Sequence, residues 1–79
     1  MAESILIIED EAKIARVIQL ELEYEGYKTE IAENGRIGLE TFQRNHFDLV
    51  LLDIRLPELN GLEVLRRIRK SGDTTVLCK

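Results

Sequence analysis

Continuous apolar runs and amphipathic segments alternate along the chain. Residues 4–8 form a largely apolar run that ends abruptly in the acidic residues 9–11, and residues 49–52 form a second run that stops at Asp53. Apolar runs without polar alternation are typical of strands that are covered on both faces, as in parallel sheets. The pattern therefore predicts two buried strands, and each of them ends in carboxylates.

Three further segments carry apolar residues at the 3.6-residue spacing of amphipathic helices. They extend over about residues 12–25, 36–44 and 62–70. Between the first two, residues 27–32 alternate apolar and polar side chains, as a half-covered edge strand does. A fourth strand is predicted to begin near residue 74.

The order of these elements is β-α-β-α-β-α-β, with short connections. This order is typical of an open parallel sheet that is wound by right-handed crossovers. The chain has 79 residues, which is enough for only one small domain. We therefore expect a single α/β domain over residues 1–79, with a sheet that is truncated after the start of the fourth strand.

The charge and the cysteine content of the chain argue against several classes of protein. The chain has 11 Lys and Arg against 15 Asp and Glu, a net charge of −4, which argues against general attraction to nucleic acid or anionic lipid. The single cysteine, Cys78, cannot form an intramolecular disulfide, and no apolar run approaches the roughly 18 residues of a membrane span. We expect a cytoplasmic protein that contacts neither membrane nor nucleic acid, and we interpret the basic residues 66–70 as cations at a helix end.

Acidic residues follow both predicted buried strands. In an open parallel sheet, ligands bind beyond the carboxyl ends of the strands, where the strand order reverses. If the two strands are neighbours, Glu9, Asp10 and Asp53 converge there. Three carboxylates repel one another, a divalent cation removes that repulsion, and an all-oxygen ligand set suits Mg²⁺. Such a site favours phosphoryl transfer, in which a carboxylate can itself be the nucleophile.

The same acids have a simpler interpretation. Acidic residues after a strand can cap the following helix or complement its dipole. Taken singly, Glu9, Asp10 and Asp53 fit this capping role as well as the ligand role. Glu11 is interpreted as a solvated residue at the start of the first helix, and His46 as a surface histidine in a loop. Only the three acids together favour the metal site.

Longer motifs carry a resemblance to a known family. They are the run ILIIEDE over residues 5–11, the Asn34-Gly35 turn followed by Gly38, and the run FDLVLLDIRLPELNGLE over residues 47–63. In these segments the chain resembles the amino-terminal two-thirds of the receiver domain of bacterial two-component response regulators, of the kind often fused to a winged-helix DNA-binding domain. The resemblance implies a flavodoxin-like fold and a phosphoacceptor module of signal transduction, and not an enzyme.

The resemblance also assigns roles to individual residues. It implies that Asp53 is the phosphoacceptor, which receives a phosphoryl group from a sensor histidine kinase with Mg²⁺ as cofactor. It further implies that Asp10 is a direct Mg²⁺ ligand and that Glu9 is an outer acid that acts mostly through water. Arg55 is implied to be a ligand through its backbone carbonyl. Pro57 and Gly61 are implied to shape the loop that lets the third helix start beside the site.

The chain also departs from the family pattern. Receivers carry a Ser or Thr at the end of the fourth strand and a Lys at the end of the fifth, and both contact the phosphoryl group. Thr74 and Thr75 lie at the start of the fourth strand, and Lys79 comes too early to be the fifth-strand lysine. We therefore expect phosphorylation to be slow or undetectable, because loss of one preorganised donor typically costs roughly 10² to 10³ in rate.

Two other functional classes compete with the signalling interpretation. The first is a non-signalling half-fold fragment that self-associates as a homodimer, through the open edge of the fourth strand and the wide apolar arc of the first helix, which includes Leu20 and Tyr24. The second is a Mg²⁺-dependent phosphohydrolase with an aspartate nucleophile. Such hydrolases usually place a second aspartate two residues after the nucleophile, where this chain has Arg55.

Overall fold

The domain is built from short strands and helices in strict alternation. The computed structural model describes residues 2–55 and 61–78. The elements are β1 (Ser4–Ile8), α1 (Ala12–Tyr24), β2 (Lys28–Ala32), α2 (Gly35–Arg44), β3 (Leu49–Leu52), α3 (Gly61–Ser71) and β4 (Thr75–Cys78). The predicted order is confirmed, and the expected bounds differ from these by about one residue.

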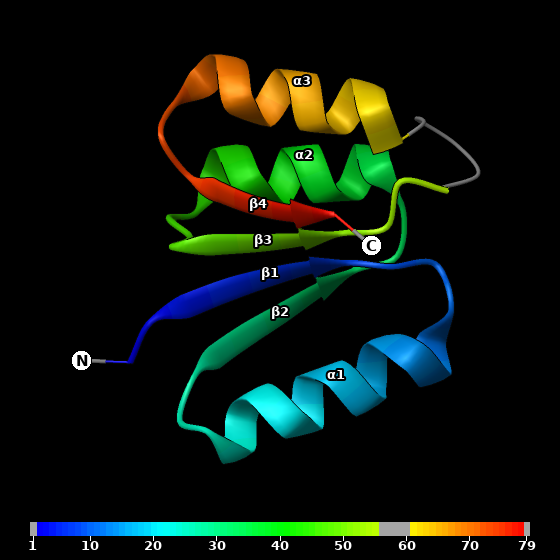
Figure 1. Ribbon diagram of the computed structural model, residues 1–79, viewed down its shortest axis with the longest axis vertical. Helices are drawn as coiled ribbons and strands as arrows, with labels where there is room; N and C mark the ends of the chain where they lie inside the picture. The colour runs from blue at the N-terminus through cyan, green and yellow to red at the C-terminus, as the bar shows by residue number, and fades with distance from the viewer. Residues whose placement is uncertain (1, 56–60, 79) are drawn as a thin grey trace.

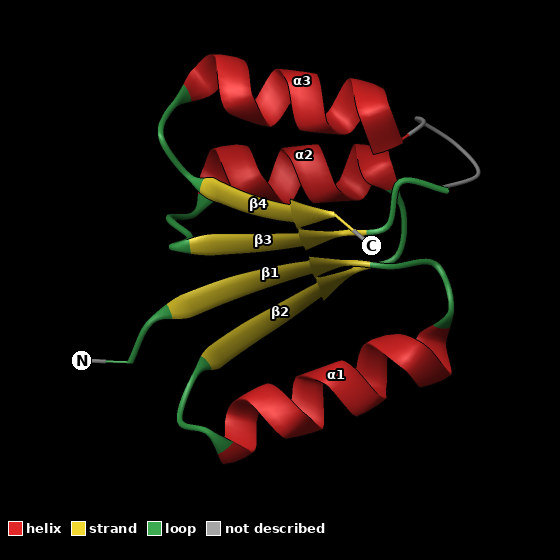
Figure 2. Cartoon of the chain, in the orientation of Figure 1, coloured by secondary structure: helices red, strands yellow, loops and turns green. Residues whose placement is uncertain are grey.

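The strands form one parallel sheet with helices on both faces. The strand order is β2-β1-β3-β4, and each neighbouring pair is parallel. Figures 1 and 2 show α1 on one side of the sheet and α2 and α3 together on the other. The path of the chain across the sheet reverses at β1, which has β2 on one side and β3 on the other. The expected open, flavodoxin-like parallel sheet is confirmed.

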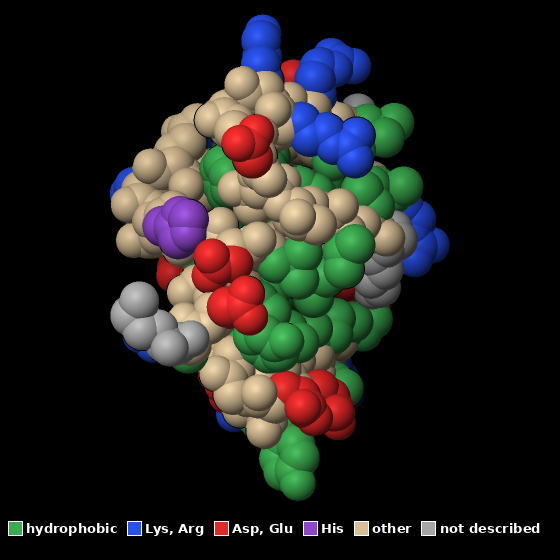
Figure 3. Space-filling view, turned by 60° about the vertical axis from the view of Figure 1, so that its left-hand side comes forward, with side chains coloured by type: hydrophobic (Ala, Val, Ile, Leu, Met, Phe, Trp, Pro, Cys, Tyr) green, Lys and Arg blue, Asp and Glu red, His purple; other side chains and the backbone are tan. Residues whose placement is uncertain are grey.

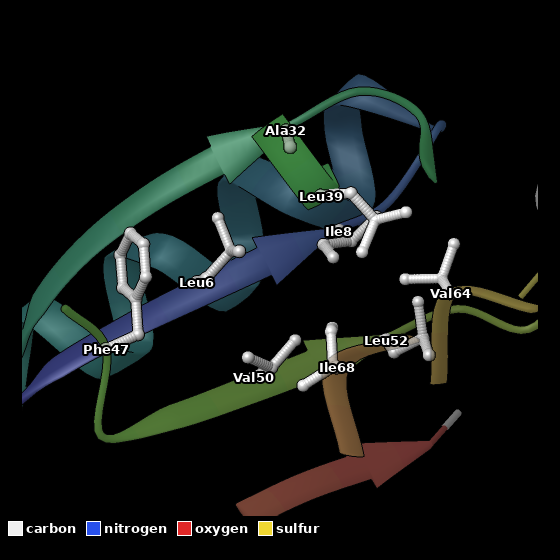
Figure 4. Packing of buried hydrophobic residues seen from close by; sticks show 9 residues of the cluster. All are labelled: Leu6, Ile8, Ala32, Leu39, Phe47, Val50, Leu52, Val64 and Ile68. Atoms are coloured by element: carbon white, nitrogen blue, oxygen red, sulfur yellow. The ribbon is translucent and has the colours of Figure 1, made fainter. Parts of the chain in front are cut away.

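Alternate residues of β1 enter two separate hydrophobic cores. Leu6 and Ile8 belong to the larger core, which α2 and α3 complete (Figure 4). Ile5 and Ile7 belong to a smaller core under α1, whose Ala15 is fully buried. Because both faces of β1 are covered, every position along this strand favours an apolar side chain.

Coverage on the α1 side of the sheet is incomplete over the described residues. Leu77 of β4 is 53% exposed, and α1 carries a row of exposed apolar side chains. This row consists of Val17, Leu20 and Tyr24. Figure 3 shows a broad area of hydrophobic side chains on one face of the molecule, with acidic side chains at its margins. The apolar arc of α1 is therefore wider than its contact with the sheet.

Ion pairs within α3 and the exposure of Cys78 are two features of the surface. Glu63 pairs with Arg66 at 3.0 Å and with Arg67 at 2.9 Å, both within α3, which agrees with the interpretation of the basic cluster as helix cations. Cys78 is exposed, because nothing described covers the outer edge of β4. Within the described residues, none of the helices has the length and apolar character that crossing a membrane requires.

Asp48 ties the start of β3 to the start of β1. Its Oδ2 accepts a hydrogen bond from the Ser4 N–H at 2.8 Å, and its own N–H donates to the Ser4 carbonyl at 2.8 Å. His46 is an exposed loop residue, as expected, and its Nε2 lies 3.3 Å from Asp48 Oδ1. The Ser4 hydrogen bond lowers the pKa of Asp48 below its ordinary value of 3.8, and His46 adds a smaller lowering.

We predict that this carboxylate contributes to acid stability. Because the pKa of Asp48 is lower in the folded chain than in the unfolded chain, its contribution is fully present above about pH 4 and is lost as the pH falls through the folded-state pKa. In Asp48→Asn, the urea midpoint of unfolding should therefore decrease less than in the wild type as the pH falls from about 4 to about 2. Asp73→Asn, at an exposed aspartate after α3, is the control, and identical slopes in wild type and Asp48→Asn would contradict the assignment.

Candidate metal centre

Three carboxylates meet at the carboxyl ends of β1 and β3. The two strands are neighbours, and their last residues, Ile8 and Leu52, are paired in the parallel register. Glu9, Asp10 and Asp53 follow directly, and one carboxylate oxygen from each lies within 4.8 Å of the others. The convergence predicted from the sequence is confirmed.

The sheet itself holds two of these acids in place. The Asp53 N–H donates to the Ile8 carbonyl at 3.0 Å, and the Glu9 N–H donates to the Ala32 carbonyl at 3.0 Å. The backbone of both residues thus continues the ladders of β3 and β1, although neither belongs to a strand. A carboxylate on such a short extension of a sheet has little freedom to move relative to its neighbours.

Glu9 and Asp53 are buried and Asp10 is exposed. The exposed fractions are 2% for Glu9 and 5% for Asp53. Each buried carboxylate accepts a hydrogen bond from its own loop, Glu9 Oε2 from the Glu11 N–H at 3.2 Å and Asp53 Oδ1 from the Arg55 N–H at 2.9 Å. Burial of a charged group is costly unless it is hydrogen-bonded and compensated by opposite charge, so this arrangement favours a bound cation.

Side-chain capping of α1 does not account for Glu9 and Asp10. Glu11 is the N-cap residue of α1, and its side chain makes no capping hydrogen bond. Side-chain capping occurs instead at α2, where Asn34 accepts from the Ile37 N–H at 2.8 Å. The preference of Asn for N-cap positions was the signal for this cap, although the sequence pattern was interpreted only as a turn.

The oxygens at this site fit a hard divalent cation such as Mg²⁺. Within residues 2–55 and 61–78, no Lys or Arg forms an ion pair with Asp10 or Asp53. Carboxylate oxygens are the ligands that Mg²⁺ prefers, and it retains several waters, so a few protein ligands suffice. Asp10, on the exposed side of the cluster, and the buried Asp53 and Glu9 are the side chains that would hold it.

The first two residues of the loop after Asp53 are connected to α3 as well as to the end of β3. Of the two residues implied to shape it, Pro57 lies outside the described residues, whereas Gly61 is the first residue of α3. The Gly61 N–H donates to the Ile54 carbonyl at 3.3 Å. Arg55 reaches the site through its N–H on Asp53, a contact that the sequence analysis missed. An aspartate side chain that accepts a hydrogen bond from the N–H two residues later forms a common type of turn. Asp53 itself was therefore the sequence signal for this contact.

An apolar cavity adjoins the two buried acids. It has a volume of about 270 Å³ and lies between α1 and the exposed part of β3 and β4. Its apolar lining includes Ile7, Ile18, Leu51 and Leu77, and Glu9 and Asp53 close one end.

Comparison with curated proteins identifies one family. Residues 5–78 match the model of the response regulator receiver domain. The transcriptional regulatory protein YkoG of Bacillus subtilis is 61% identical over 71 residues, which are 90% of this chain and 31% of YkoG. The chain therefore spans about a third of the length of the curated relatives it matches.

Solved structures show the same fold. A CheY-like receiver domain protein from Methanospirillum hungatei superposes with a TM-score of 0.95 and 33% identity, over 99% of this chain and 63% of the other. The regulator TrrA in complex with the histidine kinase ThkA gives a TM-score of 0.91 and 40% identity, over 96% of this chain and 66% of the other. TrrA of Thermotoga maritima with Mg²⁺ and BeF gives 0.87 and 39%, over 96% and 65%.

The family match covers almost the whole described chain, and the sheet has the strand order of CheY-like proteins. Similarity in sequence and similarity in fold agree on this assignment. The chain belongs to the response regulator receiver domain family.

Proposed function

We propose that Asp53 accepts a phosphoryl group from a phosphohistidine of a sensor histidine kinase, at a Mg²⁺ site formed with Asp10 and Glu9, in the cytoplasm. The observation that carries this proposal is the convergence of the three carboxylates at the ends of β1 and β3, with Asp53 buried among them. Arg55 contributes its backbone carbonyl as a further ligand. The domain acts as a signalling module that is modified, and not as a turnover enzyme.

The reaction makes one bond and breaks one. A carboxylate oxygen of Asp53 attacks phosphorus, the bond between phosphorus and the histidine nitrogen breaks, and an acyl phosphate forms on Asp53. The electron pair of the broken bond returns to the histidine ring. Mg²⁺ at this site supplies positive charge that neutralises both the carboxylates and the phosphoryl oxygens. Asp53 Oδ1 already accepts a hydrogen bond from Arg55, which orients the carboxylate for attack.

Two relatives support the partner and the cofactor. TrrA is solved in complex with a histidine kinase and, separately, with Mg²⁺ and BeF. YkoG is named a transcriptional regulatory protein. By analogy, we propose that phosphorylation of this domain serves the control of transcription through a DNA-binding output domain, and that this domain itself does not bind nucleic acid.

Phosphorylation is tested by intact-mass spectrometry after incubation with acetyl phosphate and Mg²⁺. We expect slow addition of one phosphoryl group, well below stoichiometric, which hydroxylamine removes because it cleaves acyl phosphates. Asp53→Asn should abolish the addition, because an amide cannot form the acyl phosphate. Glu40→Gln, at an exposed acid of α2, should leave it unchanged. Equal addition to Asp53→Asn and to wild type would refute the assignment of Asp53.

Mg²⁺ binding is predicted to be weak and to depend on Asp10. Sites with few protein ligands and several retained waters have dissociation constants of about micromolar to millimolar. Asp10→Asn removes one ligand charge and should weaken binding about tenfold or more. Titration followed by amide NMR shifts at residues 9, 10 and 53 measures the constant, with Asp73→Asn as control. Shifts that concentrate at other acids would place the ion elsewhere.

We also propose that the chain self-associates through β4 and the exposed apolar side chains near it. In the described sheet β4 pairs only with β3, and Leu77 is half exposed. An unpaired strand edge pairs readily with a second copy about a twofold axis. Leu77→Lys should therefore lower the sedimentation coefficient to that of a monomer, in reducing buffer, while Leu62→Lys, at an exposed apolar residue of α3, should not. A monomeric wild type would disprove this proposal.

A further inference from the structure

One peptide group connects the start of α3 to the carboxylate of Asp53. The carbonyl of Ile54 accepts a hydrogen bond from the Gly61 N–H at 3.3 Å. The N–H of Arg55, on the other side of the same peptide bond, donates to Asp53 Oδ1 at 2.9 Å. A peptide group is planar and moves as a unit, so the carbonyl cannot be displaced without moving the N–H.

Position 61 has no room for a side chain. A Cβ at Gly61 would lie 2.7 Å from both the carbonyl carbon and the carbonyl oxygen of Ile54. These are backbone atoms of the connecting peptide, which cannot move aside by changing a rotamer. Two other glycines differ: a Cβ at Gly38 would meet the flexible side chain of Ile8, at 2.6 Å, and a Cβ at Gly72 would meet nothing within 4 Å.

We propose that Gly61 is a positioning residue for Asp53, because its missing side chain lets α3 hold the Ile54–Arg55 peptide with its N–H directed at the carboxylate. The inference rests on the proposed function of Asp53 and adds a second support to it. β3 fixes the Asp53 backbone through the Ile8 carbonyl, and α3, through this peptide, fixes the carboxylate.

The orientation of the carboxylate needs this second support. The terminal torsion of an aspartate side chain has a broad energy profile, so backbone placement alone does not fix the direction of its two oxygens. With Oδ1 held by the Arg55 N–H, Oδ2 has a fixed direction relative to Asp10. Loss of hydrogen bonds that orient metal ligands typically weakens metal binding by 10- to 100-fold.

The test is Gly61→Ala, followed by amide NMR with and without Mg²⁺. In the metal-free protein the Arg55 amide proton should lose the downfield shift that a carboxylate acceptor causes. The dissociation constant for Mg²⁺ should rise about tenfold. Gly72→Ala is the control for the substitution itself, and Phe47→Leu is the control for lost stability, because Phe47 lies in the larger core at the opposite ends of the strands from the acids. Both controls should leave the Arg55 amide and the Mg²⁺ constant unchanged.

The two parts of the readout separate this inference from the proposed function. An unchanged Arg55 amide in a folded Gly61→Ala protein overturns the inference, and so does an equal loss of Mg²⁺ binding in Phe47→Leu. Absence of Mg²⁺ binding in the wild type overturns the proposed function, and the Arg55 amide then decides the positioning role alone.

A second variant covers the case in which Gly61→Ala does not fold. Asp53→Ala removes the acceptor of the Arg55 N–H, and the connected peptide should transmit this change to the Gly61 amide. We expect the Gly61 and Arg55 amide resonances to move together, with the Gly72 amide unmoved. A Gly61 amide that does not respond to Asp53→Ala would overturn the inference.

Discussion

The parallel pairing of β1 with β3 is the constraint on which the rest of the site depends. Parallel strands place their carboxyl ends at the same edge of a sheet, and the pairing of Ile8 with Leu52 brings the next residues, Glu9 and Asp53, side by side. A shift of the register by one residue would turn the side chains of a whole strand to the opposite face. The acidic cluster is thus a consequence of strand register, which the two hydrophobic cores enforce.

Packing of α2 close to β1 stabilises that register from the larger core. Gly38 of α2 lies so near Ile8 that a Cβ would come within 2.6 Å of its side chain. Leu6 and Ile8 are almost fully buried in this core, directly before the acids. A catalytic or binding group has a well-defined position when rigid elements carry it, and here the last core residue of β1 is adjacent in sequence to the first acid of the cluster.

Hydrogen bonds from two loops stabilise the buried carboxylates next to an apolar surface. Two loop N–H groups, of Glu11 and Arg55, donate to Glu9 and Asp53. These hydrogen bonds offset part of the cost of burial, and a cation at the cluster would reduce the repulsion among the three nearby carboxylates. The arrangement therefore connects the acidic cluster to the local backbone of two loops, and through the second loop to the start of α3.

The sequence by itself determined the order of the elements, the two buried strands and the acids that follow them. Hydrophobic periodicity and strand length are local properties, so they can be read directly from the order of residues along the chain. Only the tertiary structure decided the contact of Gly61 with Ile54, the exposure of Cys78 and the hydrogen bond between Ser4 and Asp48. Each of these features depends on which residues from different elements come into contact, and those distances are set by how the helices and strands pack. No spacing along the chain encodes a distance of that kind.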